Sequence, residues 1–108
     1  MNIRLTERGK LVDRFENWNS NFIGSLAKPK AGHDKGEIFV IIKEDSEYVY
    51  LVNGKNRTVD NPKKKKKKHI QLIKYNEDSL IHKIKTNQKI INEDIKRTIK
   101  IYNTVKEI

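Results

Sequence analysis

The sequence predicts a mainly β protein: a small five-stranded barrel followed by a C-terminal α-helical extension. Short runs rich in apolar, aromatic and β-branched residues recur across residues 22–74 and are separated by polar turns. From about residue 75 the apolar residues recur every three or four positions, which is the period of a helix. Five short strands in so few residues favour a barrel, because closure removes the exposed edges of a sheet.

The five expected strands cover residues 22–28, 38–42, 48–52, 55–59 and 69–73. The segment 38–42 is continuously apolar, which suits a strand buried on both faces. Residues 44–47 form a polar turn. Asn53 and Gly54 supply the two positive φ values of a type I′ hairpin, so residues 55–59 are expected to be the returning strand.

The chain divides into an N-terminal extension (1–21), the barrel (22–74) and a helical extension (75–108). In the first part, residues 7–18 have helical apolar spacing, and the alternative is a loose segment whose Trp18 docks on the barrel. In the last part, Ser79 is expected to cap a short helix and Asn92 to cap a longer one. The longer helix presents one apolar stripe, made of Ile95, Ile99, Tyr102 and Val105.

Charge narrows the class of partner. The chain has 35% charged residues and a formal net charge of +10. Residues 28–74 hold 13 basic and 6 acidic residues, so the excess is concentrated in the predicted barrel. Such a surface attracts a polyanion.

No run is long and apolar enough for a membrane span, and the first residues lack the apolar block of a signal peptide, so we expect a soluble cytoplasmic protein without a membrane partner.

The sequence contains none of the usual short motifs for catalysis or metal binding. The chain has no cysteine, and its histidines, His33, His69 and His82, have no second ligand at metal-binding spacing. No phosphate-cradling loop or nucleophile elbow is present. We therefore expect a monomeric binding protein rather than an enzyme, without a metal, a cofactor or a small-molecule substrate.

A glycine-rich loop is the most distinctive motif. Gly32 and Gly36 flank Asp34, and this arrangement predicts a compact loop with left-handed backbone angles. The Asp34 side chain is expected to shape the loop by bonding nearby amides. Lys30 and Lys35 add positive charge to the same loop.

Six consecutive lysines, Lys63 to Lys68, form the second distinctive motif. In an extended chain, lysines on one face lie about 7 Å apart, which is within the screening length of about 8 Å at physiological salt. An RNA backbone would relieve this repulsion through counterion release. Lysine is a flexible point charge, so the run is expected to grip phosphates rather than read bases. The alternative is a solvated run that protects a sheet edge from aggregation.

The candidate RNA-binding residues are the cationic ones around both motifs: Lys28, Lys30, His33, Lys35, Lys55, Arg57, Lys63, Lys64, Lys65, Lys66, Lys67, Lys68 and His69. Arg57 either contacts RNA or is a plain surface arginine, and His69 either joins the run or caps the next strand. Tyr48 and Tyr50 are expected to pack rather than to stack on bases.

The order of these motifs resembles that of KOW-domain proteins. The residues that carry the resemblance are Lys30–Gly36 with Phe39–Ile41, then Asn53-Gly54-Lys55 with Arg57, then Pro62–Lys65, and finally Lys68-His69. The likeness covers about residues 22–73 and is strongest to bacterial KOW proteins related to large-subunit ribosomal proteins of the eukaryotic and archaeal type. It implies an SH3-like barrel that binds structured RNA, often ribosomal RNA, and a role in translation.

Three functions remain open from the sequence. The first is a ribosome-associated RNA-binding protein that contacts the large subunit. The second is a protein-interaction module of the transcription-elongation type, since KOW domains occur in that setting as well. The third is a non-specific nucleic-acid binder.

Overall fold

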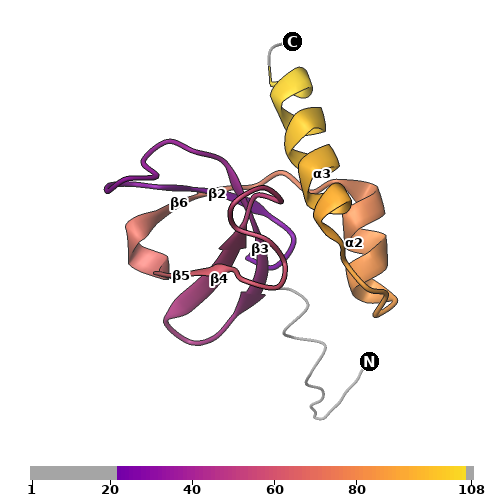
Figure 1. Cartoon of the computed structure of the whole chain (residues 1–108), viewed down its shortest axis with the longest axis horizontal. Coiled ribbons are helices and arrows are strands. Elements are labelled where there is room, and N and C mark those ends of the chain that lie inside the picture. The colour runs from indigo at the N-terminus through magenta and orange to yellow at the C-terminus, as the bar shows by residue number, and fades with distance from the viewer. Residues whose placement is uncertain (1–21, 107–108) are drawn as a thin grey trace.

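The computed structural model describes residues 22–106 of the chain. Its elements, in chain order, are β2 (Leu26–Pro29), β3 (Phe39–Glu44), β4 (Tyr48–Val52), β5 (Lys63–Lys66), the 3₁₀ helix η1 (Lys67–His69), β6 (Ile70–Ile73), α2 (Asp78–Lys85) and α3 (Asn92–Val105). The strands form one open antiparallel sheet in the order β5-β4-β3-β2-β6, and both helices lie on the same side of it (Figure 1). The mainly β fold with a C-terminal helical part is confirmed. The helix expected within residues 7–18 lies outside the described residues.

The edge strands β5 and β6 are consecutive in the chain, and η1 alone joins them. Backbone hydrogen bonds anchor both ends of η1. The N–H of Lys67 donates to the carbonyl of Glu47 (2.8 Å), in the turn between β3 and β4. The N–H of Lys30 donates to the carbonyl of His69 (2.9 Å), at the start of the loop between β2 and β3. The lysine-rich edge is therefore attached to two loops that are distant in sequence.

The central strand β3 is buried on both faces, as its continuous apolar run predicted. Phe39 and Ile41 belong to one apolar cluster, which also contains Val49 and Leu51 of β4. Val40 belongs to a second cluster on the opposite face, where Leu26, Val52, Leu80 and Ile95 bring together β2, β4, α2 and α3. Successive strand residues point to opposite faces, so a strand covered on both sides must be apolar throughout.

The predicted hairpin at Asn53-Gly54 is wrong, and so is its returning strand 55–59. Only Gly54 of the two has a positive φ (81°), whereas a type I′ turn needs one at both positions. Asn53 is buried at 5% exposure, and its side-chain oxygen accepts the N–H groups of Lys55 (2.9 Å) and Arg57 (3.1 Å). These bonds hold a wide loop, and the strand that returns along β4 is β5, the lysine run itself.

The first strand is shorter than expected. Residues 22–24 form a turn closed by the Ser25 N–H and the Phe22 carbonyl (3.0 Å). The strand then runs to Pro29, which pairs with Ile70 of β6. Strand β4 has the predicted bounds, and β6 starts one residue later than predicted.

Both helices form where the helical spacing of apolar residues predicted them, but the residues that cap them are not the predicted Ser79 and Asn92. The Glu77 side chain, rather than Ser79, caps α2 by accepting the N–H of Ser79 (3.0 Å). Helix α3 already includes Asn92, whose side-chain oxygen accepts the N–H of Val59 (3.0 Å) instead. Asp94 accepts the N–H of Ile91 (3.0 Å) and so satisfies the helix start.

The apolar stripe of α3 is confirmed over most of its length. Ile95, Ile99 and Tyr102 pack in the second apolar cluster, whereas Val105 is 47% exposed. Figure 1 shows the C-terminal turns of α3 extending past the sheet, which accounts for the exposure of Val105. Neither described helix has the length and apolar character that a transmembrane span requires.

Candidate nucleic-acid interface

The lysine run is an ordered edge of the sheet. Lys63 to Lys66 pair with β4 as β5, and Lys67 and Lys68 begin η1. On one face, Lys63 lies opposite Leu51 and Lys65 opposite Val49, both of which are fully buried. Lysine stems cover apolar side chains while their ammonium groups reach water. Four consecutive lysines therefore form a strand because half of them lie beside the core.

The other face of β5 carries lysines beside tyrosines. Lys64 lies opposite Tyr50 and Lys66 opposite Tyr48. The Lys64 ammonium sits 4.3 Å from the centre of the Tyr48 ring, a distance at which a cation is attracted to the ring face. Tyr50 donates to Asp45 (3.3 Å) and carries the ammonium of Lys43 at 5.2 Å. Both half-buried tyrosines are thus engaged within the protein.

The glycine-rich loop has the left-handed backbone that the sequence predicted. Gly32 has a φ of 92° and Gly36 a φ of 82°. Two turns follow each other, closed by the N–H of Lys35 on the carbonyl of Gly32 (3.2 Å) and the N–H of Glu37 on the carbonyl of Asp34 (3.0 Å). A Cβ added at either glycine would meet no atom within 4 Å, so the requirement for glycine is conformational rather than steric.

Asp34 connects this loop to the lysine run. Its carboxylate accepts a hydrogen bond from the ammonium of Lys63, and the two form an ion pair. That hydrogen bond lowers the pKa of Asp34 below its ordinary value; burial opposes the shift, while the charges of Lys63, Arg57 and His33 add to it. Among the described residues, no loop amide donates to the Asp34 side chain. Asp34 therefore fixes the position of the loop against β5 rather than the shape of the loop itself.

Residues 30–36 and 63–69 together form what we call the loop–lysine surface. The Asp34–Lys63 ion pair joins one end of the run to the loop, and the bond from Lys30 to His69 joins the other. Arg57 lies close enough for its charge to act on Asp34. The exposed cationic side chains of this surface are Lys30, His33, Lys35, Lys64, Lys68 and His69.

Two lysines of the run are already neutralised within the protein. Lys63 pairs with Asp34, and Lys67 pairs with Glu44 (2.8 Å) while its ammonium lies 4.6 Å from the centre of the Phe22 ring. These carboxylates come from loop and strand positions far from the run in sequence. No local signal in the sequence points to either pairing.

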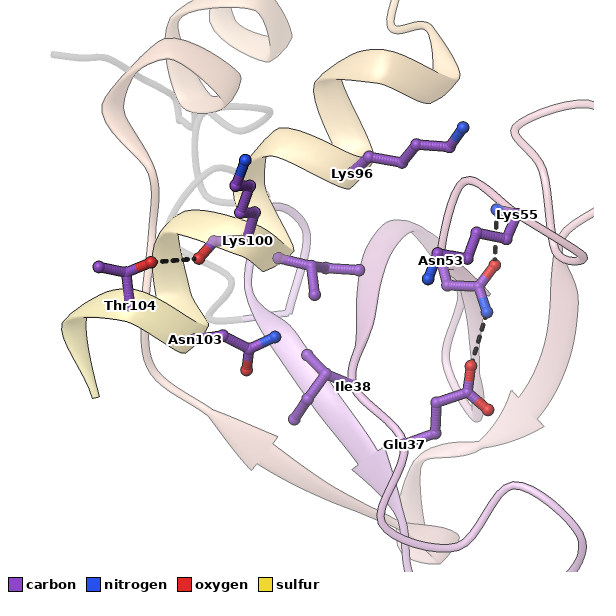
Figure 2. A pocket seen from close by; sticks show the side chains of 9 residues that line it. Glu37, Ile38, Asn53, Lys55, Lys96, Lys100, Asn103 and Thr104 are labelled. Carbon is purple, nitrogen blue, oxygen red and sulfur yellow. Dashed lines mark hydrogen bonds between the residues drawn. The ribbon is translucent and has the colours of Figure 1, made fainter. Parts of the chain in front are cut away.

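Two predicted site residues do not join the loop–lysine surface through any described contact. Lys28 is half-buried on β2, opposite Gln71 of β6. Lys55 lies instead beside α3, on a groove that it shares with Lys96 and Lys100 (Figure 2). Lys96 and Lys100 lie off the apolar stripe of α3, and no spacing in the sequence indicates that they face Lys55.

Comparisons with known proteins add no assignment. No family model matches this sequence, and no curated protein matches it either. Within residues 22–106, no three His, Asp or Glu side chains are arranged to hold a metal ion. The interpretation of the loop–lysine surface therefore depends on its charge and geometry.

Proposed function

We propose that this chain is an RNA-binding protein that grips the phosphate backbone of a structured RNA, with large-subunit ribosomal RNA as the expected target. The observation that carries the proposal is the joining of the glycine loop to the lysine run at both ends, through Asp34–Lys63 and through Lys30–His69. An isolated charge run on a sheet edge needs no such partner loop. Two cationic segments held side by side form the broader surface that a folded polyanion requires.

The arrangement of the strands supports an SH3-like barrel of the KOW type as the scaffold. The edge strands β5 and β6 are linked by a single turn of 3₁₀ helix, which turns one edge of the sheet toward the other. A loop with two left-handed glycines between the first two described strands fits the same arrangement. In this scaffold the loop and the lysine edge serve as one binding surface.

The chemistry of the surface favours backbone contact over base reading. Lysine ammonium groups are point charges that contact phosphate without fixing a base pattern. Lys64 and Lys68 are exposed and form no ion pair with an acidic side chain among the described residues, so they are the first candidates for phosphate contact. Lys63 and Lys67 would have to exchange a carboxylate for a phosphate.

Crosslinking in cells followed by sequencing of the bound RNA tests the proposal. We expect the full-length protein to recover large-subunit ribosomal RNA and the variant with Lys64→Ala and Lys68→Ala to recover much less. Substituting Lys89 and Lys106 by Ala removes the same charge from the helical part and serves as the matched control. Equal recovery by all three proteins, or recovery of large-subunit ribosomal RNA without enrichment over its share of the input RNA, would contradict the proposal.

Shape recognition is tested separately in vitro. A protein that fits folded RNA should bind a structured ribosomal RNA fragment more tightly than duplex DNA of equal length at the same salt concentration. Equal affinities would indicate non-specific binding to any polyanion.

A further inference from the structure

A groove separate from the loop–lysine surface lies between α3 and the loops that precede β3 and follow β4 (Figure 2). This α3 groove has a volume of about 620 Å³, which is within the usual range for ligand-binding pockets. Ile38 and Ile99 give it an apolar floor, while Lys55 on one wall and Lys96 and Lys100 on the other give it a cationic rim. The groove is thus built for a ligand with both apolar and anionic parts.

Among residues 22–106, the rim lysines have no ion-pair partner. No described acidic side chain forms an ion pair with Lys55, Lys96 or Lys100, and all three are exposed. The carboxylate among the lining residues, Glu37, accepts a hydrogen bond from the Asn53 amide (2.7 Å) on the loop wall, as Figure 2 shows. Charge complementarity therefore calls for an anionic occupant along the α3 wall.

We propose that the α3 groove binds an extended peptide segment of a partner protein with the pattern acidic–apolar–acidic. In an extended segment, neighbouring side chains point to opposite faces and alternate ones lie about 7 Å apart. A central apolar side chain would then rest on Ile38 and Ile99, while the two flanking carboxylates point back to the rim. Lys96 and Lys100 are four residues apart on a helix, with about 6 Å between their Cβ atoms, which matches that spacing.

The lining favours a peptide over RNA as the occupant. Single-stranded RNA is held by bases stacked on aromatic or arginine side chains, and the residues that line this groove include neither. An aliphatic floor suits a leucine-like side chain, and the Asn103 amide on α3 is available to a peptide backbone.

The proposal is independent of RNA binding. Figure 1 shows η1 and the tip of the β2–β3 loop on the side of the sheet away from α3. Substitutions in the groove therefore leave the loop–lysine surface intact, and the reverse holds as well. A failure of one proposal does not imply a failure of the other.

NMR titration of the ¹⁵N-labelled full chain tests the inference. The probe is the peptide Gly-Ser-Asp-Leu-Asp-Ser-Gly, and the controls are the same peptide with Asn-Leu-Asn or Asp-Ser-Asp at its centre. We expect saturable shifts of the Ile38 and Ile99 amide signals with the probe, and weaker binding of both controls. The absence of saturable shifts at these positions would overturn the proposal.

Variants at the rim make the test specific. Replacing Lys96 and Lys100 by Ala should lower the affinity for the probe peptide about fivefold to tenfold, because two exposed ion pairs are lost. Replacing both lysines by Glu should abolish binding. The matched control replaces Lys74 and Lys89 by Glu and should leave binding unchanged; circular dichroism checks that each variant is folded. Equal loss in the control would overturn the proposal, as would a single-stranded RNA oligonucleotide that shifts the same signals and displaces the peptide.

Discussion

Removing two exposed lysines from the loop–lysine surface should change the salt dependence of RNA binding by a calculable amount. The perturbation is the double substitution Lys64→Ala and Lys68→Ala. Both side chains are exposed, and neither forms an ion pair with an acidic side chain among the described residues. Their contacts with phosphate would release condensed counterions, so their loss must appear in the slope of log affinity against log salt.

The ion pairs in the structure determine how large the slope of log affinity against log salt should be. If the unpaired lysines of the run, Lys64, Lys65, Lys66 and Lys68, each contact a phosphate, the slope should be about −3, at about 0.7–0.9 per contact. The double variant should flatten it by about 1.5. Counting the lysines without the structure would give a steeper value, because Lys63 and Lys67 are held by their own carboxylates.

Fluorescence anisotropy of a labelled, folded ribosomal RNA fragment over a series of KCl concentrations measures the slope. The variant with Lys89→Ala and Lys106→Ala has the same net charge and should keep the wild-type slope. The reasoning is refuted if the double variant at Lys64 and Lys68 also keeps that slope, or if both variants flatten it equally. In the first case the run faces elsewhere, and in the second only total charge matters.

Three further predictions concern the ion pairs and the glycines. The double substitution Asp34→Asn with Lys63→Met removes the ion pair that joins the glycine-rich loop to β5 without changing the net charge. The slope of log affinity against log salt should therefore stay within about 0.3 of wild type, while RNA affinity falls by a few fold. A flattening of the slope by about 1 would mean that Lys63 contacts phosphate. Asp94→Asn should lower the free energy of unfolding by about 2 kcal/mol in urea denaturation, because a carboxylate that is only 3% exposed bonds Lys83 and a helix-start amide; a loss below about 0.5 kcal/mol would contradict this. Gly54→Ala should lower the free energy of unfolding by about 2–3 kcal/mol, because the added Cβ would lie 2.9 Å from a backbone oxygen of α3. Gly36→Ala should lower it by only about 1 kcal/mol, because Gly36 has a similar φ but open space around it. Equal losses in the two variants would mean that the contact with α3 contributes nothing.

Asp94 also sets a pH dependence. Burial opposes its ionisation, but the Ile91 amide and the charge of Lys83 outweigh burial and lower the pKa of Asp94 below 3.8. A carboxyl group with a lowered pKa in the folded state stabilises the protein above its unfolded pKa, and this contribution is lost as the pH falls through the folded pKa. Wild type should therefore lose stability below about pH 4 more steeply than Asp94→Asn. Parallel curves from thermal unfolding at several pH values would contradict this.

Local patterns in the sequence were sufficient for most of the elements. The aromatic and β-branched content of Tyr48–Val52 and the apolar run of β3 predicted strands from propensity and from burial, which act on neighbouring residues. The stripe of α3 follows from the 3.6-residue period. Gly32 and Gly36 predicted the left-handed loop, because few other residues adopt that backbone. Each of these signals is contained within a few positions.

The assembly of the site depended on contacts between residues that are far apart in sequence. Asn53-Gly54 has the sequence of a tight turn, yet Asn53 bonds Glu37 and Gly54 packs on α3, so the chain returns only at Lys63. Lys55 and Lys63 have the same chemistry, but one faces α3 and the other pairs with Asp34. The sequence by itself determined which segments are strands, helices and charged. Which charges meet was decided only by the tertiary structure, because a pairing across the fold leaves no trace in the spacing of either partner.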